Sequence, residues 1–370
     1  MGKRRYRDWG GSDRKLSVEY EGAVYMLKFA ENHAKKTDMS TSYVNSVISE
    51  YISSHIAATT DLPVHETVLG YYNDDIVVAC KDFRQTNERN IEFQEFVHAV
   101  YDSKDIKRVI KLSQIYETLN DKTAFDDNLK QSSIDRYWET FVVDALVGNF
   151  DRHIGNWGYI ANDNTNTIRL APLYDFGSTL LPQLSDDGMI DIVNNEFEML
   201  RRCLVFPSPA LYVKDEKVGK VGYYDMMSSN YDENCTKAVK RIVPQIKLND
   251  VYNIIDNTPL ISDTRKTFYK KIITLRKETV LDRAYDCCTT QKYDTDALER
   301  LQKGKQYSED LLNREIALGS VKSNIMLQSF EQSVAEITEI DQNKSETNII
   351  KKLTIQKEYE RQGRDRSQNK

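Results

Sequence analysis

The sequence predicts an α+β protein with two lobes, a β-rich small lobe followed by a larger helical lobe. Hairpin patterns dominate the first 83 residues, and a helical spacing of apolar side chains dominates from there to about residue 290. The last part of the chain holds no proline and carries charges of both signs. We therefore expect a small lobe over residues 1–83, a large lobe over residues 84–290 and a charged helical extension over residues 291–370.

The small lobe is predicted to contain two hairpins and one helix. Apolar and polar residues alternate on both sides of Glu21-Gly22, a pair typical of a tight hairpin turn. The second hairpin turns at residues 73–75, and its last strand, IVVAC, is apolar throughout and is expected to be buried on both faces. Helical spacing over residues 43–58 predicts a helix between the hairpins. The four strands are expected at residues 16–20, 23–29, 67–72 and 76–80.

The large lobe is predicted to be helical from Arg84 onward, with one further hairpin. Its clearest helix begins near Ser132 and Ser133, carries a stripe of apolar side chains and leads into the segment GNFDRHIGNWG. Two short runs, WGYIA and TIRLAPLY, lie on either side of the turn-rich segment NDNTN and predict a hairpin. Helices return after Gly177 and continue to about residue 290.

Composition and charge argue against several classes of protein. The 370 residues hold 51 lysines and arginines against 57 aspartates and glutamates, and this net charge of −6 argues against nucleic-acid binding as the main activity. No apolar run approaches the ~20 residues that span a bilayer, and no apolar segment of a signal peptide follows the charged N-terminus. The five cysteines lack paired spacing, so neither a disulfide framework nor a zinc site is expected. We expect a cytoplasmic protein.

The segment most informative about chemistry runs from Asp151 to Asn156 and is followed by a DFG triplet that begins at Asp175. Phosphoryl transfer from a nucleotide needs a carboxylate that takes or orients the proton of the attacking hydroxyl, and an Asn and an Asp that hold Mg²⁺. In protein kinases four residues separate the base from the Asn, and the metal-binding Asp opens a DFG motif. Asp151, Asn156 and Asp175 reproduce this order, and the predicted hairpin should bring Asp175 back beside Asn156. Alone, Asp151 fits an ordinary loop or cap residue better, whereas the ordered combination favours a kinase site.

A kinase also needs a cation on the phosphates, normally a strand lysine that is paired with a helix glutamate. Lys28 lies near the end of the predicted strand AVYMLKF, and Glu50 lies among apolar residues of the following helix. A carboxylate in such a position is costly to bury unless it is paired, so a salt bridge between Glu50 and Lys28 is expected. The alternative is that Lys28 faces solvent at a strand end and that Glu50 is exposed on the helix.

Two weaker signals complete the candidate site. Gly10, Gly11 and Ser12 precede the first strand, and glycines allow backbone N–H groups to approach phosphate oxygens. This segment matches neither the glycine-rich loop of protein kinases nor a Walker A motif, and a flexible turn is the alternative. Among the histidines, only His153, inside the DRH triplet, is a candidate site residue.

The strings GNFDRHIGNWGYI and LAPLYDFGS resemble the catalytic loop and metal segment of HipA-like serine/threonine kinases. These are bacterial kinases with a compact two-lobed fold that is related to protein kinases and phosphoinositide kinases. The strings SEYISSHIAATTDLPVHETVLG, IVVACKDF and IIDNTPLIS narrow the resemblance to stand-alone members of the family, which include a proinflammatory factor of a gastric pathogen. The resemblance covers about residues 8–290. It implies a kinase fold and a virulence factor, and it leaves open a release or translocation into host cells by a non-classical route.

Carried over position by position, the resemblance implies that Asp151 is the catalytic base and that Asn156 and Asp175 are Mg²⁺ ligands. It places His153 beside the phosphates and Lys28 on the α-phosphate side of ATP. The hinge whose backbone reads adenine would be formed by Cys80, Lys81, Asp82 and Phe83.

The resemblance also bears on regulation and partners. HipA-like kinases autophosphorylate a serine of the glycine-rich loop; Asp8 aligns with that position, and Ser12 and Ser17 are the nearest hydroxyls. The resemblance favours Ser12, and the alternative is that Ser12 is an ordinary turn residue. A phosphate on Ser12 would add about −1.5 to −2 charges at pH 7 and repel ATP. The toxins of the family have an extra N-terminal region that helps to contact an antitoxin, whereas this sequence starts close to the glycine segment. Antitoxin-coupled DNA binding is therefore not expected here. The tail after residue 290 lies outside the resemblance and is a candidate partner-binding helix.

These observations predict a kinase that uses ATP and Mg²⁺ and phosphorylates a serine or threonine hydroxyl of a protein. One alternative keeps the fold and changes the acceptor to a lipid or small molecule, since a fold does not fix the substrate. Another is a nucleotide-binding pseudokinase that acts as an interaction module through its tail. Against it, an inactive scaffold has no need to keep Lys28, Asp151, Asn156 and Asp175 together.

Overall fold

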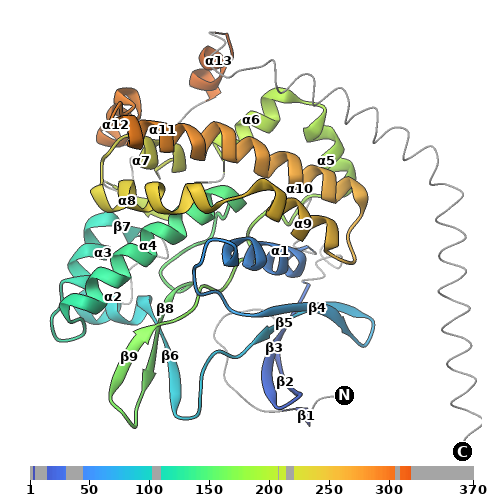
Figure 1. Ribbon diagram of the computed structural model, residues 1–370, viewed down its shortest axis with the longest axis vertical. Helices are drawn as coiled ribbons and strands as arrows, with labels where there is room; N and C mark the ends of the chain where they lie inside the picture. Colours follow the sequence, from blue (N-terminus) through green and yellow to red (C-terminus); the bar gives the residue numbers. More distant parts are fainter. Residues whose placement is uncertain are drawn as a thin grey trace, which may run out of the picture. The chain divides into compact units, whose positions relative to one another are not determined.

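The structure is a computed structural model with an α+β architecture, as the sequence predicts (Figure 1). Contacts between residues divide the chain into two units, Met1–Arg314 and Glu315–Lys370, and the first unit holds the sheets and the helices around them. The segment boundaries expected at residues 83 and 290 stay predictions. The described residues are 3–4, 15–30, 45–101, 110–206, 208–213, 221–304 and 309–317.

A sheet of five strands, counted among the described residues, forms the small lobe and confirms both hairpins. The two-residue turn Glu21-Gly22 has positive φ at both positions, as a tight hairpin between twisted strands requires. In the second hairpin the last strand begins at Asp75, so the turn is shorter than residues 73–75. Adjacent Val77 and Val78 point to opposite faces and are both buried, as expected for IVVAC. The sheet is antiparallel in the order β1-β2-β3-β5-β4, with β1 (Lys3–Arg4), β2 (Lys15–Tyr20), β3 (Ala23–Phe29), β4 (Thr67–Tyr72) and β5 (Asp75–Lys81).

Helix α1 (Ser46–Ala58) connects the small lobe to the large one. It packs against β4 and β5 on one side and against α9 (Leu248–Asn257) on the other. Ile52 and Ile56 are completely buried in these contacts. The helix agrees with the prediction over residues 43–58, except that residues 43 and 44 lie outside the described ranges. Helix α1 therefore lies between the sheet of the small lobe and a helix of the large lobe.

The prediction that the chain is helical from Arg84 onward is wrong in two places. Strand β6 (Glu88–Glu92) pairs with β8 (Gly158–Asn162), which also pairs with β9 (Thr167–Leu170) to complete the predicted hairpin. A Cβ atom on Gly158 would lie 2.1 Å from the carbonyl oxygen of Ile91, so only glycine permits this close approach of β6 and β8. A short parallel pair forms the second exception, and it joins β7 (Ile110–Lys111) to β10 (Leu211–Tyr212).

Helix α4 (Asp127–Val147) runs through the large lobe and delivers the chain to the segment that begins at Asn149. It starts earlier than Ser132, because the Asp126 side chain caps it by accepting a hydrogen bond from Leu129 N at 2.7 Å. Its first turn is mostly polar and exposed, which explains why apolar spacing misses it. The helix ends at Gly148, whose φ of +67° is the left-handed conformation that favours glycine at a helix C-terminus.

Most of the other helices of the first unit lie in the upper part of Figure 1, above the two larger sheets, and several of them pack against α4. Among the described helices, none is both long and apolar enough to cross a bilayer. They are α2 (Phe93–Tyr101), α3 (Leu112–Leu119), α5 (Asp186–Val193), α6 (Glu196–Leu204), α7 (Tyr223–Ser228), α8 (Glu233–Ile242), α10 (Asp263–Arg276), α11 (Arg283–Thr290), α12 (Thr295–Lys303) and α13 (Glu309–Ala317).

Candidate active site

Lys28 joins two carboxylates that are far apart in the sequence. Its Nζ atom lies 2.8 Å from Glu50 Oε2 and 2.8 Å from Asp175 Oδ1. The salt bridge expected between Lys28 and Glu50 therefore forms, and the alternative of an exposed Glu50 is wrong, because Glu50 is fully buried. Burial favours the neutral amine, but the two carboxylates outweigh it and raise the pKa of Lys28. The lysine is thus a fixed cation between α1 and the DFG segment.

The side chain of Asp175 is partly open to solvent. It is 40% exposed, whereas Phe176, the next residue, is fully buried. Asp175 has a φ of +64°, a backbone conformation that is uncommon outside glycine and that clusters at functional sites. Burial raises and Lys28 lowers the pKa of Asp175, and the net effect is a pKa below the usual value. Phe176 therefore anchors the segment while Asp175 presents an ionised carboxylate.

The loop from Asn149 to Asn156 is held by its own hydrogen bonds. The carbonyl of Asp151 accepts from His153 N at 2.8 Å and from Asn156 Nδ2 at 2.7 Å. Because the amide nitrogen of Asn156 is used in this way, its Oδ1 atom remains the acceptor end of the side chain. Asp151 N in turn donates to Asn149 Oδ1 at 3.1 Å. The loop thus fixes the positions of Asp151 and Asn156 relative to each other.

His153 is buried in the same loop. Its Nδ1 atom accepts a hydrogen bond from Gly155 N at 3.0 Å, so the neutral ring carries its hydrogen on Nε2. A Cβ atom on Gly155 would lie 3.0 Å from the ring, so a larger residue here would crowd His153. In the neutral ring, His153 Nε2 is therefore a donor and not an acceptor.

Arg152 is a site residue that the sequence reasoning missed. Its guanidinium bonds Asp144 at both oxygens, with Nε to Oδ2 at 2.9 Å and Nη2 to Oδ1 at 3.2 Å. Its Nη1 atom donates to the backbone carbonyls of Asn156 and Tyr174, and the group lies 4.6 Å from the ring centre of Phe176. One buried arginine thus joins the loop to the residue before Asp175. This brings the Asn156 and Asp175 segments together, as expected.

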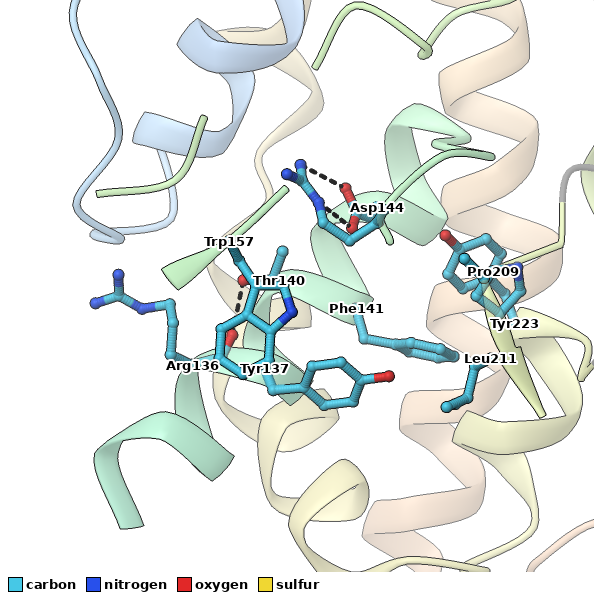
Figure 2. Close-up of a pocket in the computed structure, with 11 residues that line it drawn as sticks. Arg136, Tyr137, Thr140, Phe141, Asp144, Trp157, Pro209, Leu211 and Tyr223 are labelled. Carbon is cyan, nitrogen blue, oxygen red and sulfur yellow. Dashed lines mark hydrogen bonds and ion pairs between the residues drawn. The ribbon is translucent and has the colours of Figure 1, made fainter. Parts of the chain in front are cut away.

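A small cavity lies beneath this arginine, on the side of α4. Its volume is about 20 Å³, enough for about one water molecule, and Figure 2 shows Asp144 among the residues that line it. Aromatic side chains fill the space around it, and Tyr223 Oη donates to the carbonyl of Asn149 at 2.7 Å. The loop therefore rests on a packed base that leaves little room for movement.

Glu92, at the end of β6, is a second missed residue. The next-but-one residue, Gln94, donates its N–H to the carbonyl of Ile154 at 3.0 Å, which anchors this end of β6 to the loop. The carboxylate of Glu92 lies 3.2 Å from the place where a Cβ atom on Gly155 would be. Burial and nearby carboxylates raise the pKa of Glu92. No sequence pattern marks Glu92 as a site residue, because its position beside the loop depends on the pairing of β6 with β8.

The segment expected to read adenine lies at the end of β5. Lys81 N donates to the Glu66 carbonyl at 2.9 Å and Asp82 N donates to the Val24 carbonyl at 2.8 Å, so these two N–H groups are engaged within the small lobe. The thiol of Cys80 is buried. The adenine-reading role of this hinge stays a prediction. Gly10, Gly11 and Ser12 lie outside the described residues.

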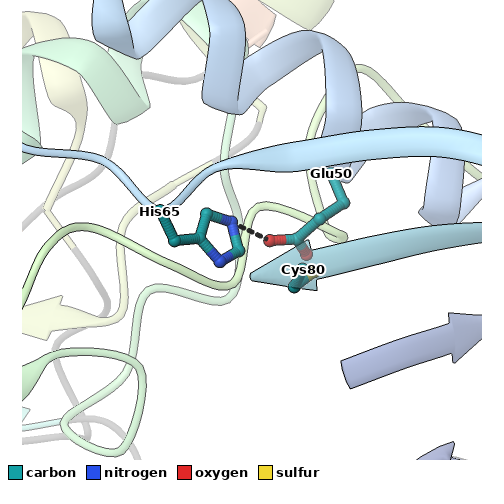
Figure 3. Close-up of side chains that lie close together, drawn as sticks. All are labelled: Glu50, His65 and Cys80. Atoms are coloured by element: carbon teal, nitrogen blue, oxygen red, sulfur yellow. Dashed lines mark ion pairs between the residues drawn. The ribbon is translucent and has the colours of Figure 1, made fainter. Parts of the chain in front are cut away.

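Glu50, His65 and Cys80 form a buried cluster whose ligand atoms all lie within 4.8 Å of one another (Figure 3). Both oxygens of Glu50 are already paired, one with Lys28 and one with His65 Nε2 at 3.0 Å. Burial raises the pKa of the Cys80 thiol, which therefore stays protonated and is a poor metal ligand. The cluster is therefore a set of buried polar side chains in which the Lys28 cation already neutralises the carboxylate.

Comparisons with known proteins agree on one family. The model of the HipA-like C-terminal domain matches residues 8–243. The serine/threonine-protein kinase CtkA of Helicobacter pylori strain J99 is 33% identical over 276 residues, which are 75% of this chain and 83% of that protein.

Among solved structures, one of the same H. pylori kinase is similar to this chain. The crystal structure of the H. pylori proinflammatory kinase CtkA aligns with a TM-score of 0.73 and 31% identity, over 80% of this chain and 98% of that one. HipA of Shewanella oneidensis MR-1, solved with HipB and operator DNA, aligns over 77% of this chain and 68% of that one with a TM-score of 0.42 and 14% identity, too low to support a further conclusion.

Proposed function

The chain belongs to the HipA-like C-terminal domain family, and from this membership we propose that it is a protein kinase that transfers the γ-phosphate of ATP to serine or threonine with the help of Mg²⁺. One observation carries the proposal: Lys28 contacts Glu50 and Asp175, each at 2.8 Å. Phosphoryl transfer in kinases requires a lysine–glutamate pair and a DFG aspartate in place together.

The residues around Lys28 fit Mg²⁺ and a nucleotide by their chemistry. Mg²⁺ prefers oxygen ligands; Asp175 offers a partly exposed carboxylate, and Asn156 has its amide oxygen available because its Nδ2 atom is used by the loop. We assign these two residues as the metal ligands and Lys28 and His153 to the phosphates. When bound, Mg²⁺ would neutralise charge that develops on the phosphates.

Asp151 is assigned as the base. Its carboxylate takes the proton of the acceptor hydroxyl while that oxygen forms a bond to the γ-phosphorus, the bond from phosphorus to the bridging oxygen breaks, and ADP leaves with the electron pair of that bond. The hydrogen bonds to the Asp151 carbonyl, at 2.7 and 2.8 Å, support this role because they fix the backbone that carries the carboxylate.

The remaining assignments extend the same site. The hinge at Cys80, Lys81 and Asp82 reads adenine through backbone groups other than the N–H groups of Lys81 and Asp82, which are engaged within the small lobe. The segment that contains Gly10 and Gly11 covers the phosphates. Autophosphorylation falls on Ser12. A protein partner binds through the extension at residues 291–370.

The test is an incubation of the chain with γ-labelled ATP and Mg²⁺, first with a generic protein substrate and then with phosphoinositide vesicles. Label on serine or threonine of protein, absent in Asp151→Asn, is the expected result. Label that enters only the lipid would refute the protein acceptor and indicate a lipid kinase. ATP binding without transfer to any acceptor would refute the kinase and indicate a pseudokinase.

A further inference from the structure

His65 contacts Glu50 from the side opposite to Lys28. Its Nε2 atom lies 3.0 Å from Glu50 Oε1, whereas Lys28 Nζ lies 2.8 Å from Glu50 Oε2, and Figure 3 shows the imidazole aimed at the carboxylate. The Glu50 carboxylate is ionised, since Lys28 and His65 outweigh burial and hold its pKa below the usual value. An ionised carboxylate offers only acceptor atoms, so a hydrogen on His65 Nε2 faces Glu50 Oε1 across a 3.0 Å polar contact rather than in a well-aligned hydrogen bond. Ser54 Oγ, 3.1 Å from the same nitrogen, completes its surroundings.

The backbone of His65 is bound to the strand that leads to Asp175. His65 N donates to the Leu173 carbonyl at 2.9 Å, and Leu173 N donates to the Pro63 carbonyl at 2.8 Å. Val64 and Leu173 form a parallel bridge between these hydrogen bonds. Residues 63–65 therefore fix a position two residues before Asp175, while the His65 side chain holds Glu50.

Glu50 and Asp175 are thus connected in two ways. One connection runs directly through the Lys28 ammonium group, and the other runs through His65 and Leu173 without Lys28. In the site proposed above, Lys28 must also bind phosphate oxygens and Asp175 must also bind Mg²⁺. Each of these new contacts competes with the direct connection, because a phosphate shares the positive charge of Lys28 and Mg²⁺ shares the negative charge of Asp175.

We propose that His65 is a positioning residue of this site, which holds Glu50 beside Asp175 while Lys28 turns toward a phosphate. This role rests on the proposed kinase function. If the imidazole of His65 is removed, the buried Glu50 Oε1 atom loses this polar contact. Glu50 then competes more strongly with the phosphates for Lys28. A net hydrogen bond to a charged group of this kind corresponds to a change of about 10- to 100-fold in an equilibrium constant.

The variant His65→Leu removes the donor, and His65→Gln restores an N–H near the place of Nε2. The matched control is His55→Leu, because His55 belongs to α1 and binds Tyr51 O at 2.8 Å but does not contact Glu50. Dissociation constants are measured by calorimetry for MgATP and for adenosine, which lacks phosphates. We expect His65→Leu to weaken MgATP binding about 10- to 100-fold and to leave adenosine binding unchanged. His65→Gln and His55→Leu should stay within about threefold of the wild type, below the range for one charged hydrogen bond.

The outcomes separate the two proposals. If the wild type binds MgATP and His65→Leu binds it equally well, the role of His65 is overturned and the kinase proposal stands. Equal losses for MgATP and adenosine would also overturn the role, because they indicate a general loosening of the small lobe. If the wild type binds no MgATP, the kinase proposal fails, and the role of His65 fails with it. If His65→Leu does not fold, His65→Gln is compared with His65→Asn, whose shorter amide does not reach Glu50, and equal MgATP affinities for this pair would overturn the role.

Discussion

Replacing Arg152 with methionine should destabilise the protein and uncouple the two halves of the candidate site. The side chains of Arg152 and Asp144 are 7% and 1% exposed, and the pair is bidentate. Removing one member of a buried ion pair leaves an uncompensated charge and costs about 3–5 kcal/mol. The change also removes the donor shared by the carbonyls of Asn156 and Tyr174. Against a total stability of about 5–15 kcal/mol, the loss is large.

The assay is urea unfolding followed by tryptophan fluorescence, to which Trp157 beside the cavity contributes. The matched control is Arg89→Met on β6, because Arg89 forms a pair with Asp163 at 3.3 Å in which the two side chains are 54% and 66% exposed. An exposed pair of this kind contributes only about 0–1 kcal/mol. A second variant, Arg152→Met with Asp144→Leu, removes the buried charge as well and should recover much of the lost stability.

Two results would refute this reasoning. If Arg152→Met loses no more stability than Arg89→Met, the buried pair does not support the loop as described. If the double variant recovers stability and also binds MgATP like the wild type, the arginine is not needed to join the loop to the DFG segment.

Three further predictions concern other parts of the molecule. Asp175→Ala should abolish the Mg²⁺ dependence of ATP binding, measured by titration with and without the metal; an unchanged dependence would remove Asp175 from the metal ligands. The pKa of Glu50 is depressed by Lys28 and His65 in spite of burial, so its stabilisation is present above the unfolded pKa of about 4.3 and is lost as the pH falls through the lower folded pKa. The difference in unfolding free energy between the wild type and Glu50→Gln should therefore be constant between about pH 5 and 7 and shrink below about pH 4; a constant difference at all pH values would contradict this. Arg300→Met should cost about 3–5 kcal/mol in urea unfolding, because Arg300 on α12 holds the buried carboxylate of Asp225 at 2.7 and 3.0 Å; a loss below about 1 kcal/mol, as for an exposed pair, would mean that α12 is not anchored there.

The elements that depend only on residues close together in the sequence could be predicted from it. The hairpin at Glu21-Gly22 is predicted from a turn pair and from the alternation of apolar and polar residues on both sides of it. The buried strand IVVAC is predicted from its apolar residues alone. Strand β6 escaped prediction because its sequence, ERNIE, is polar and its partner β8 comes much later in the chain. The early start of α4 was missed because a capping aspartate, and no apolar stripe, marks it.

The same distinction applies to the candidate site. The pairing of Lys28 with Glu50 could be predicted, because a glutamate on an apolar helix face requires a cation. The order of the motifs predicts that Asp151, Asn156 and Asp175 belong to one site, and their catalytic roles stay predictions. Arg152 and His65 could not be found, because their importance depends on burial and on partners brought together only by the fold.

The most direct test of the central claim measures ATP binding and phosphate transfer on the same Asp151→Asn protein. The loop that carries Asp151 is fixed by backbone hydrogen bonds, so the amide should leave the site intact. We expect the dissociation constant for MgATP to stay near that of the wild type and transfer to serine or threonine to slow by about 10²–10⁴-fold, the range for a positioned acid–base group. Transfer by Asp151→Asn at the wild-type rate would contradict the assignment of the base and the kinase mechanism built on it.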